Sequence, residues 1–328
     1  MIKNQKPIIS KQLSLDQVVK CCNDDIKDFA ENFFRLEHTW LHNAYNAFKD
    51  IEKYLILVFL INKTLKTYND HFYNLSFEKF YKLDQFEIEK INIIEIVKEL
   101  SISKETARRK LNELNQEGII KRNRKEISVI NPFKDQKPIN NIIELSKLLK
   151  WVSFKLNKIY GLNSFDSGYF LNIIKKNYTR NWHIFFNFQL KYILGAKKVY
   201  GSYDAFYIFA CCALNQSYNL KNFGINNQRK TINLLNFPDV ITEYTKLNSK
   251  GLNATTISEI TGMPRASVIR KLKYLVNKKL LFKNNQNLFI ISTPKDQPIE
   301  FKKLRNLFEK NQLLIRMALK DLLNQTII

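Results

Sequence analysis

The stretch ELSISKETARRKLNELNQEGIIKRN, residues 99–123, decides the fold expected for this chain. Ser103 can cap a helix that begins at the next residue, because a serine hydroxyl accepts hydrogen bonds from the unpaired N–H groups of a first turn. Three apolar residues then recur at the spacing that buries one helix face: Ala107, Leu111 and Leu114. Gly118 supplies the left-handed residue with which helices commonly end. The pattern predicts a short helix with one buried face and one basic, exposed face.

The residues on either side of this helix complete a small unit. From Ile91 the sequence INIIEIVKELSIS predicts a preceding helix, whose apolar residues are expected to face inward: Ile93, Ile94, Ile96, Val97 and Leu100. After Gly118, the sequence IIKRNRKEISVI predicts two short strands joined by a basic turn at residues 122–125. The expected order is therefore helix, turn, basic helix and two-stranded wing.

This order resembles the winged helix-turn-helix of bacterial transcription regulators, and SKETARRKLNELNQEGIIKR is most similar to the catabolite activator and Fnr family. In that family the second helix lies in the major groove of DNA. The resemblance implies base-edge contacts for Lys104, Glu105 and Arg109, and phosphate contacts for Ser103 and Thr106. Lys104 stands where the family usually has arginine, so bidentate recognition of guanine is not expected at that position.

A second stretch, EITGMPRASVIRKLKYLVNKKLLFKN at residues 259–284, repeats the pattern. Arg109 aligns with Arg270 and Leu111 with Leu272, and the differences 270 − 109 and 272 − 111 both equal 161. This copy is similar to the motif of IclR-like and MarR-like regulators. Val268, Leu272 and Leu275 are expected to face inward, and the DNA-contacting residues are expected to be Arg265, Ser267, Arg270, Lys271 and the wing residue Lys283. Ala266 aligns with Glu105, so the two copies are expected to read different half-sites.

The similarity extends beyond the two motifs. Each is preceded by an aromatic-rich helical stretch, at residues 39–63 and 189–216, although the register slips there. Each is followed by related segments, INPFKDQKPI and ISTPKDQPIE, and then by an amphipathic helix. The expected fold is mainly α, with two tandem repeats that each combine a helical region, a winged helix-turn-helix with a small β-wing and a closing helix. The repeats are placed at residues 1–160 (motif at 91–132) and 161–328 (motif at 252–294), joined at Gly161–Gly168.

Composition and charge favour a polyanionic partner. Only 8 Gly and 7 Pro in 328 residues argue against folds that consume glycine at turns, and 53 Lys and Arg against 30 acids give a net charge of +23. An AT-rich genome would also inflate lysine, but it would not explain clustered arginines. Four arginines gather on the basic helix and the wing of the first motif, where phosphate and base contacts explain them: Arg108, Arg109, Arg122 and Arg124. Lys125, in the same wing turn, is also expected to contact DNA.

Other classes of site and location receive little support from the sequence. Neither a signal peptide nor a membrane span is expected, which indicates a cytoplasmic protein. The adjacent cysteine pairs are expected to be reduced, and His38 and His42 are expected on a helix surface rather than at a metal. No cofactor is expected. Phosphate-binding loops, metalloprotease motifs and carboxylate clusters are missing from the sequence, so an enzyme is not expected.

Three functions fit these observations. The first is a sequence-specific regulator of transcription that binds double-stranded DNA through two recognition helices, as an internal pseudo-dimer. RNA polymerase and a further copy of the chain are additional partners compatible with that role. The second is a plasmid or phage replication initiator, which would bind tandem repeats and melt DNA. The third is a protein-interaction scaffold, which would lack a salt-dependent affinity for DNA.

Overall fold

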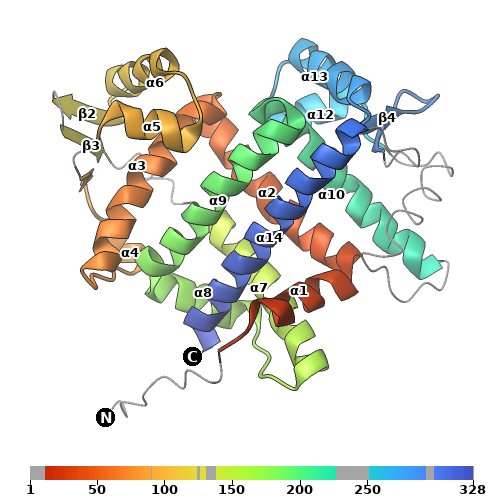
Figure 1. The fold of residues 1–328 in the computed structure, drawn as a ribbon, viewed down its shortest axis with the longest axis horizontal. Helices are drawn as coiled ribbons and strands as arrows, with labels where there is room; N and C mark the ends of the chain where they lie inside the picture. The colour runs from red at the N-terminus through yellow and green to blue at the C-terminus, as the bar shows by residue number, and fades with distance from the viewer. Residues whose placement is uncertain are drawn as a thin grey trace.

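The computed structural model describes residues 12–89, 91–123, 126–130, 138–226, 251–292 and 299–327. Thirteen helices and two small antiparallel sheets form this part of the chain. Long helices cross one another in the body, and two small units of helices and strands project from the same edge of it (Figure 1). The mainly α fold expected from the sequence is confirmed.

Residues 1–160 are called the first half and residues 161–328 the second half. The elements of the first half are α1 (Leu15–Asp24), α2 (Ile26–Phe48), α3 (Ile51–Asp70), α4 (Phe77–Phe80), β1 (Gln85–Glu87), α5 (Ile93–Leu100), α6 (Lys104–Gln116), β2 (Ile120–Asn123), β3 (Glu126–Ile130) and α7 (Ile139–Tyr160). Those of the second half are α8 (Ser167–Lys176), α9 (Tyr178–Tyr200), α10 (Tyr203–Asn226), α12 (Ala254–Thr261), α13 (Arg265–Asn277), β4 (Leu281–Lys283), β5 (Phe289–Ile291) and α14 (Ile299–Ile327).

The elements of the two halves follow one another at fixed intervals along the chain. The helices α1, α2 and α3 begin 152 residues before α8, α9 and α10, since 167 − 15, 178 − 26 and 203 − 51 are equal. For α5, α6 and β2 against α12, α13 and β4 the interval is 161, from 254 − 93, 265 − 104 and 281 − 120. The helical stretches, whose register slips in the sequence comparison, thus keep a constant register in the structure.

Each aromatic-rich stretch is divided into two helices by a left-handed residue followed by an N-cap. In the first half these are Lys49, with φ of 50°, and Asp50, whose side chain accepts the backbone N–H of Glu52 at 3.0 Å. In the second half they are Gly201, with φ of 77°, and Ser202, which accepts the N–H of Ala205 at 3.2 Å. A left-handed residue ends one helix and a capping side chain starts the next, so the break lies at the same place in both.

The two halves interlock through their long helices. α10 packs along α2, while α3 packs along α9, so each half contributes a helix to the other. The closing helices pack on the corresponding helix of their own half, α7 on α2 and α14 on α9, and each also contacts the first helix of the other half, α7 on α8 and α14 on α1. Aromatic pairs occupy corresponding places: Trp40 lies 5.2 Å from Tyr54, and Tyr192 lies 5.8 Å from Phe206, measured between ring centroids.

A buried carboxyl and a buried amide meet where α2 and α9 face each other. Gln189 Nε2 donates to Glu37 Oε1 at 2.8 Å, and 189 − 37 is again 152, so the two residues hold corresponding positions. Burial raises the pKa of Glu37 to about 8, against the opposing effect of the hydrogen bond from Gln189. Glu37 Oε2 and Gln189 Oε1 are buried without a hydrogen-bond partner among the described residues. A protonated Glu37 can donate its own O–H, which suits it to such a site.

The small sheets complete the two projecting units. In the first sheet β3 lies between β1 and β2, with Gln85 opposite Ile130 and Ile120 opposite Val129. In the second sheet β4 pairs with β5, and Leu252 forms a single bridge to Phe289. The strand β1 was not expected from the sequence. It has only three residues, and its partner lies more than forty residues further along the chain.

Several expectations about individual residues were wrong. His38 and His42 do not lie on an open helix surface, because α10 covers them: His42 Nδ1 is 2.9 Å from Tyr207 Oη, and burial lowers the pKa of His38 to about 4. Ile94 does not face inward and is 46% exposed. The join at 161–168 is shorter than expected, because α8 begins at Ser167. The repeated KDQ-containing segments lie largely outside the described residues, at 131–137 and 293–298.

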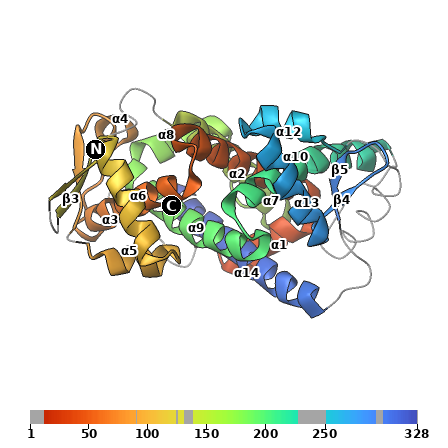
Figure 2. The ribbon, with the colours of Figure 1, turned by 90° about the horizontal axis from the view of Figure 1, so that it is seen from above.

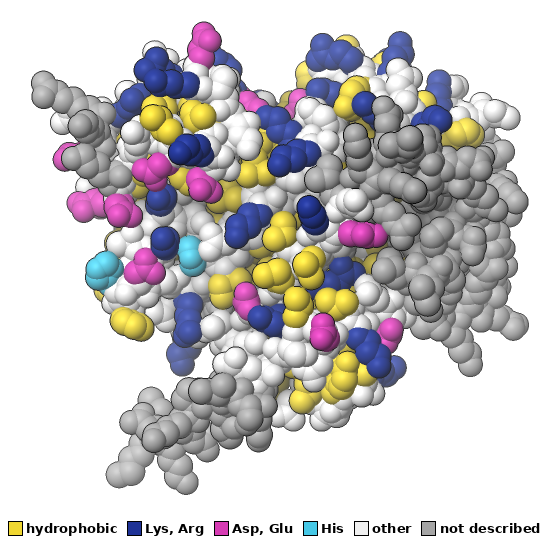
Figure 3. All heavy atoms as spheres, viewed as in Figure 1, with side chains coloured by type: hydrophobic (Ala, Val, Ile, Leu, Met, Phe, Trp, Pro, Cys, Tyr) yellow, Lys and Arg dark blue, Asp and Glu magenta, His cyan; other side chains and the backbone are white. Residues whose placement is uncertain are grey.

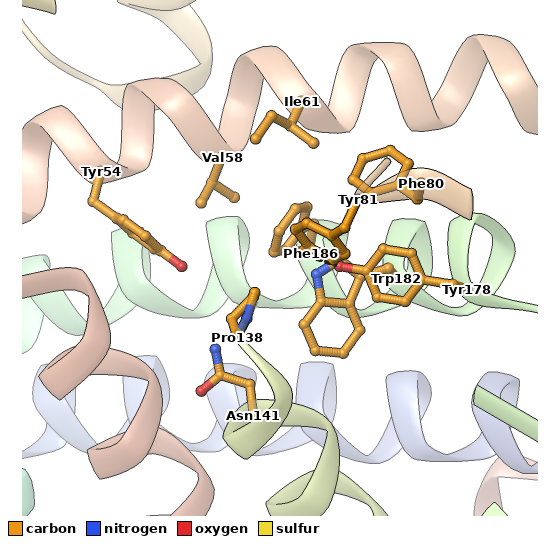
Figure 4. A pocket seen from close by; sticks show the side chains of 10 residues that line it. All are labelled: Tyr54, Val58, Ile61, Phe80, Tyr81, Pro138, Asn141, Tyr178, Trp182 and Phe186. Carbon is orange, nitrogen blue, oxygen red and sulfur yellow. Dashed lines mark hydrogen bonds between the residues drawn. The ribbon is translucent and has the colours of Figure 1, made fainter. Parts of the chain in front are cut away.

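The aromatic residues form a core rather than a ligand pocket. Figure 4 shows the cavity between α3, α4 and α9, into which Tyr54, Tyr178 and Trp182 project. Its volume is about 10 Å³, which is room for about one water molecule.

The four cysteines are buried and unpaired with one another. In the described part of the chain no helix is both long and apolar enough to cross a membrane, and no cluster of three metal-ligating side chains is found.

Candidate nucleic-acid interface

The first module, defined as α5, α6, β2 and β3, is set by local capping. The side chain of Asn92 accepts the N–H of Ile94 at 3.1 Å at the start of α5, and Ser101 ends that helix with φ of 49°. Ser103 then accepts the N–H of Thr106 at 3.0 Å and starts α6. Gly118 follows the helix with φ of 71°, as expected. The helix-turn-helix predicted from residues 99–123 is confirmed.

The second helix of this module, α6, has the predicted faces. Ala107, Leu111 and Leu114 are buried, and the exposed positions are Lys104, Glu105, Arg108 and Arg109. The two predicted phosphate-contacting residues are engaged with each other, because Ser103 Oγ donates to Thr106 Oγ1 at 2.8 Å. The Ser103 hydroxyl also caps α6 by accepting the Thr106 N–H, so a phosphate would have to compete with that cap.

Arg109 belongs to a charged network on the exposed side of α6. Its Nη1 lies 2.6 Å from Glu113 Oε1, and Lys53 Nζ lies 3.4 Å from Glu113 Oε2 and 2.6 Å from Glu117 Oε1. Partial burial of Glu113 opposes ionisation, but hydrogen bonds from Lys53 and Arg109 lower the pKa of its carboxyl overall. Glu113 therefore stays ionised and holds Arg109 in place.

A buried lysine joins α6 to the body. Lys110 forms an ion pair with Asp50, the residue that caps α3, and only 8% of the Lys110 side chain is exposed. The sequence comparison did not single out Lys110, because a lysine on a basic helix looks like one more surface charge. Its position on the buried side of α6, one residue before Leu111, is the signal that could have identified it.

The second module, defined as α12, α13, β4 and β5, has the same order of elements. Asn253 caps α12, Gly262 ends it with φ of 69°, and Pro264 holds the N-cap position of α13. Val268, Leu272 and Leu275 are buried, as predicted.

The predicted DNA-contacting residues of the second module divide into two groups by exposure. Arg265, Arg270 and Lys283 are exposed, and Arg265 Nε donates to Thr255 Oγ1 at 3.2 Å. Ser267 and Lys271 were expected to point outward but are half-buried. Lys271 Nζ donates to Ser202 Oγ at 2.9 Å, so Lys271 contacts the start of α10 as Lys110 contacts the start of α3.

The wings extend the basic surface. On β2 Arg122 is exposed, and its backbone N–H donates to Asn115 Oδ1 at 3.1 Å, which ties the wing to α6. Arg124 and Lys125, which were expected to contact DNA, lie outside the described residues. Viewed from above, α6 and α13 lie toward opposite ends of the molecule with α2 and α9 between them (Figure 2). Lys and Arg side chains gather over both modules along the upper edge in Figure 3.

The first module therefore has the geometry of a helix-turn-helix with a small wing sheet. A family described as DeoR-like helix-turn-helix domain matches residues 87–131, which run from the end of β1 through β3. The matched family is thus not the catabolite activator and Fnr family that was expected from the sequence of this motif. No curated protein and no solved structure matches the chain.

Proposed function

We propose that this protein is a sequence-specific regulator of transcription that binds double-stranded DNA with both modules, as an internal pseudo-dimer. The observation that carries the proposal is the placement of two basic helices, α6 and α13, on one edge of a single interlocked body (Figure 1). The match to a DeoR-like helix-turn-helix domain supports DNA binding by the first module. The role is one of binding and not of catalysis.

Equivalence of the second module rests on buried details rather than on sequence similarity alone. The intervals of 152 and 161 residues hold for the starts of six pairs of elements. Lys110 and Lys271 both reach the residue that precedes and caps a long helix earlier in their own half, Asp50 before α3 and Ser202 before α10. The aromatic pairs Trp40–Tyr54 and Tyr192–Phe206 also correspond. We infer that the two halves arose by duplication of one unit.

The exposed chemistry suits contacts in two successive major grooves. In helix-turn-helix proteins the second helix enters the groove, and paired readers bind half-sites about one helical turn apart. Arg109 and Arg270 occupy equivalent exposed positions on α6 and α13, where an arginine can form a bidentate contact with guanine. Arg122 and Lys283 on the wings suit phosphate contacts, which add affinity without reading sequence.

The test is to select DNA fragments from random pools with the pure protein and to measure affinity over a range of salt. We expect enriched sites with two different half-sites and an affinity that falls steeply with salt, because lysines and arginines release condensed counterions. A flat salt titration would contradict DNA binding and favour the scaffold. Enrichment of a single half-site would contradict the role of the second module.

The paired modules also fit a second role, a replication initiator. Such a protein would bind tandem repeats and unpair the DNA beside them. Permanganate, which modifies unpaired thymines, distinguishes the two roles on the selected sites. Protection without new permanganate reactivity supports the regulator, whereas reactive thymines next to the bound repeats support the initiator.

A further inference from the structure

A polar cleft lies between α3, α5 and α9, at the point where the first module meets the second half of the chain. Its volume is about 290 Å³, large enough for a small organic molecule rather than for water alone. The apolar side chains of Phe59 and Leu190 form part of its wall. The three helices lie beside one another on the left side of Figure 1.

Three polar side chains form a closed ring of hydrogen bonds at this cleft. Asn62 Nδ2 donates to Asn187 Oδ1 at 2.8 Å, and His183 lies 2.9 Å from Asn62 Oδ1 and 3.0 Å from Asn187 Nδ2. Burial lowers the pKa of His183, so its ring is neutral at neutral pH and adds no charge. Each amide nitrogen carries a second hydrogen, so the ring also offers donors to an acceptor.

Lysines from all three helices surround this ring. Lys66 on α3, Lys98 on α5 and Lys191 on α9 are exposed at the cleft. A fourth lysine, Lys63, is paired with Glu95 at 2.9 Å. With Glu99 as the other acid, the lining has four lysines and two carboxylates and is therefore net positive. Lysine ammonium groups from separate elements suit a compact anion with several acceptor oxygens, such as a phosphate.

The other half of the chain has no lysines at the positions that correspond to Lys66, Lys98 and Lys191. At the corresponding positions of the other half stand Tyr218, Glu259 and Thr39, from 66 + 152, 98 + 161 and 191 − 152. None of these is basic, and one is acidic. The convergence of charge is thus particular to the side of the molecule that carries the first module.

We propose that this cleft binds a phosphate group, with Lys66, Lys98 and Lys191 as its cationic contacts. The phosphate bridges α5 of the first module and α9 of the second half, and so fixes the orientation of one recognition helix relative to the other. This regulatory consequence rests on the proposed function, whereas phosphate binding does not. A phosphorylated small molecule and the backbone of bound DNA are the two possible sources of the group.

The experiment titrates inorganic phosphate into the full chain at constant ionic strength, with thermal unfolding and calorimetry as readouts. The test variant is Lys98→Gln with Lys191→Gln. The matched control is Lys150→Gln with Lys158→Gln, two exposed lysines of α7. Phosphate also stabilises proteins in general by exclusion from their surfaces, and the control variant measures that effect. At ten times its Kd, a bound ligand raises the folded-to-unfolded ratio roughly tenfold.

We expect a saturable rise in Tm for the natural protein and the control, and loss of the saturable part in the test variant. A response shared equally by all three proteins would overturn the site. Binding to random-sequence DNA then identifies the source. An unchanged salt slope in the test variant indicates a phosphorylated small molecule, and a slope reduced by about two indicates DNA phosphates. Failure of the natural protein to bind DNA contradicts the proposed function alone, because the phosphate titration still decides the site.

Discussion

The two modules have the same buried framework and different exposed chemistry. In both, three apolar residues bury one face of the second helix and a lysine reaches the start of a long helix. On the outside, α6 and the residue after it carry Glu105, Glu113 and Glu117. The corresponding positions of the second module hold Ala266, Tyr274 and Lys278. Packing constrains the buried positions, whereas the exposed positions are free to differ between the two modules.

The acids of the first module have a structural counterpart in the second. In the first, Lys53 and Arg109 are held by Glu113 and Glu117. In the second, Tyr274 lies over Gly201, where an added Cβ would come within 2.2 Å of its hydroxyl oxygen. An ion network therefore joins α6 to α3 in the first half, and an aromatic contact joins α13 to the break between α9 and α10 in the second. We expect the first module to bind DNA with less unspecific affinity, since its acids repel phosphate.

The largest expected effect concerns the carboxyl and amide at corresponding positions of α2 and α9. The pKa of Glu37 is about 8 in the folded chain and 4.5 when unperturbed, so its stabilising contribution is complete below pH 4.5 and is lost as the pH rises through 8. Between pH 4.5 and pH 8, each rise of one pH unit should therefore lower the free energy of unfolding by about 1.4 kcal/mol. Tyr192, whose pKa is raised by burial, stays protonated in this range.

Glu37→Gln makes the two positions identical and should remove this slope. Urea unfolding between pH 5 and pH 8 measures it. We expect the variant to be more stable than the natural protein at pH 8, and the two curves to approach each other toward pH 5. Parallel curves would mean that Glu37 is ionised in the folded chain.

The next effect compares the contacts that anchor α6 and α13 to the body, Lys110 with Asp50 and Lys271 with Ser202. Asp50→Ala removes a helix cap and leaves Lys110 buried without its counter-ion, so we expect a loss of about 3 kcal/mol in the free energy of unfolding. Ser202→Ala removes a cap and a neutral acceptor from Lys271, which is half-buried, and should cost about 1 kcal/mol. Denaturant unfolding of both variants gives the comparison, and equal losses would show that the charge at Asp50 contributes little.

A third prediction distinguishes the proposed DNA contacts of α6 from those of α13. Arg109→Ala should relax preference in one half-site and Arg270→Ala in the other, each by about 1–3 kcal/mol of discrimination. Arg122→Ala should weaken binding to all sequences alike, because a phosphate contact carries no sequence information. Affinities for selected sites altered one half at a time decide this. Equal losses on every sequence would show that both arginines contact phosphates only.

The smallest effect lies at the left-handed residues between the long helices. Lys49→Gly should gain about 1 kcal/mol of stability, because a glycine adopts φ near 50° without strain. Gly201→Ala should lose at least about 1 kcal/mol at φ of 77°, in addition to displacing Tyr274. Thermal unfolding of the pair tests the equivalence of these two positions. A gain in both variants would contradict the observed backbone at Gly201.

The sequence predicted the features that depend on residues close together in the chain, such as helix faces and helix caps. The spacing of Ala107, Leu111 and Leu114 and the caps around them were sufficient for the helix-turn-helix of the first module. Lys271 could not be placed in this way, since its direction depends on Ser202, which is 69 residues away in the sequence. His42 was misplaced for the same reason, because Tyr207 is 165 residues distant.

The register of the long helices was also hidden from the sequence. The residues that mark the helix break differ in kind, Lys49 and Asp50 in one half and Gly201 and Ser202 in the other. Their backbone roles are the same, but a comparison of letters does not reveal this. The polar cleft between α3, α5 and α9 could not be predicted from the sequence either, because its lysines come from three segments that only the interlocked packing brings together.

For the role proposed above, the interlocking of α3 with α9 and of α10 with α2 determines how promoter occupancy depends on protein dose. In a regulator made of separable subunits with one reader each, the subunits must first meet, so occupancy at low dose rises with the square of concentration. Here dilution cannot part the two readers, because one folded chain carries both. Occupancy should then rise in simple proportion to copy number, and a cell with only a few molecules would respond in a graded way rather than across a threshold.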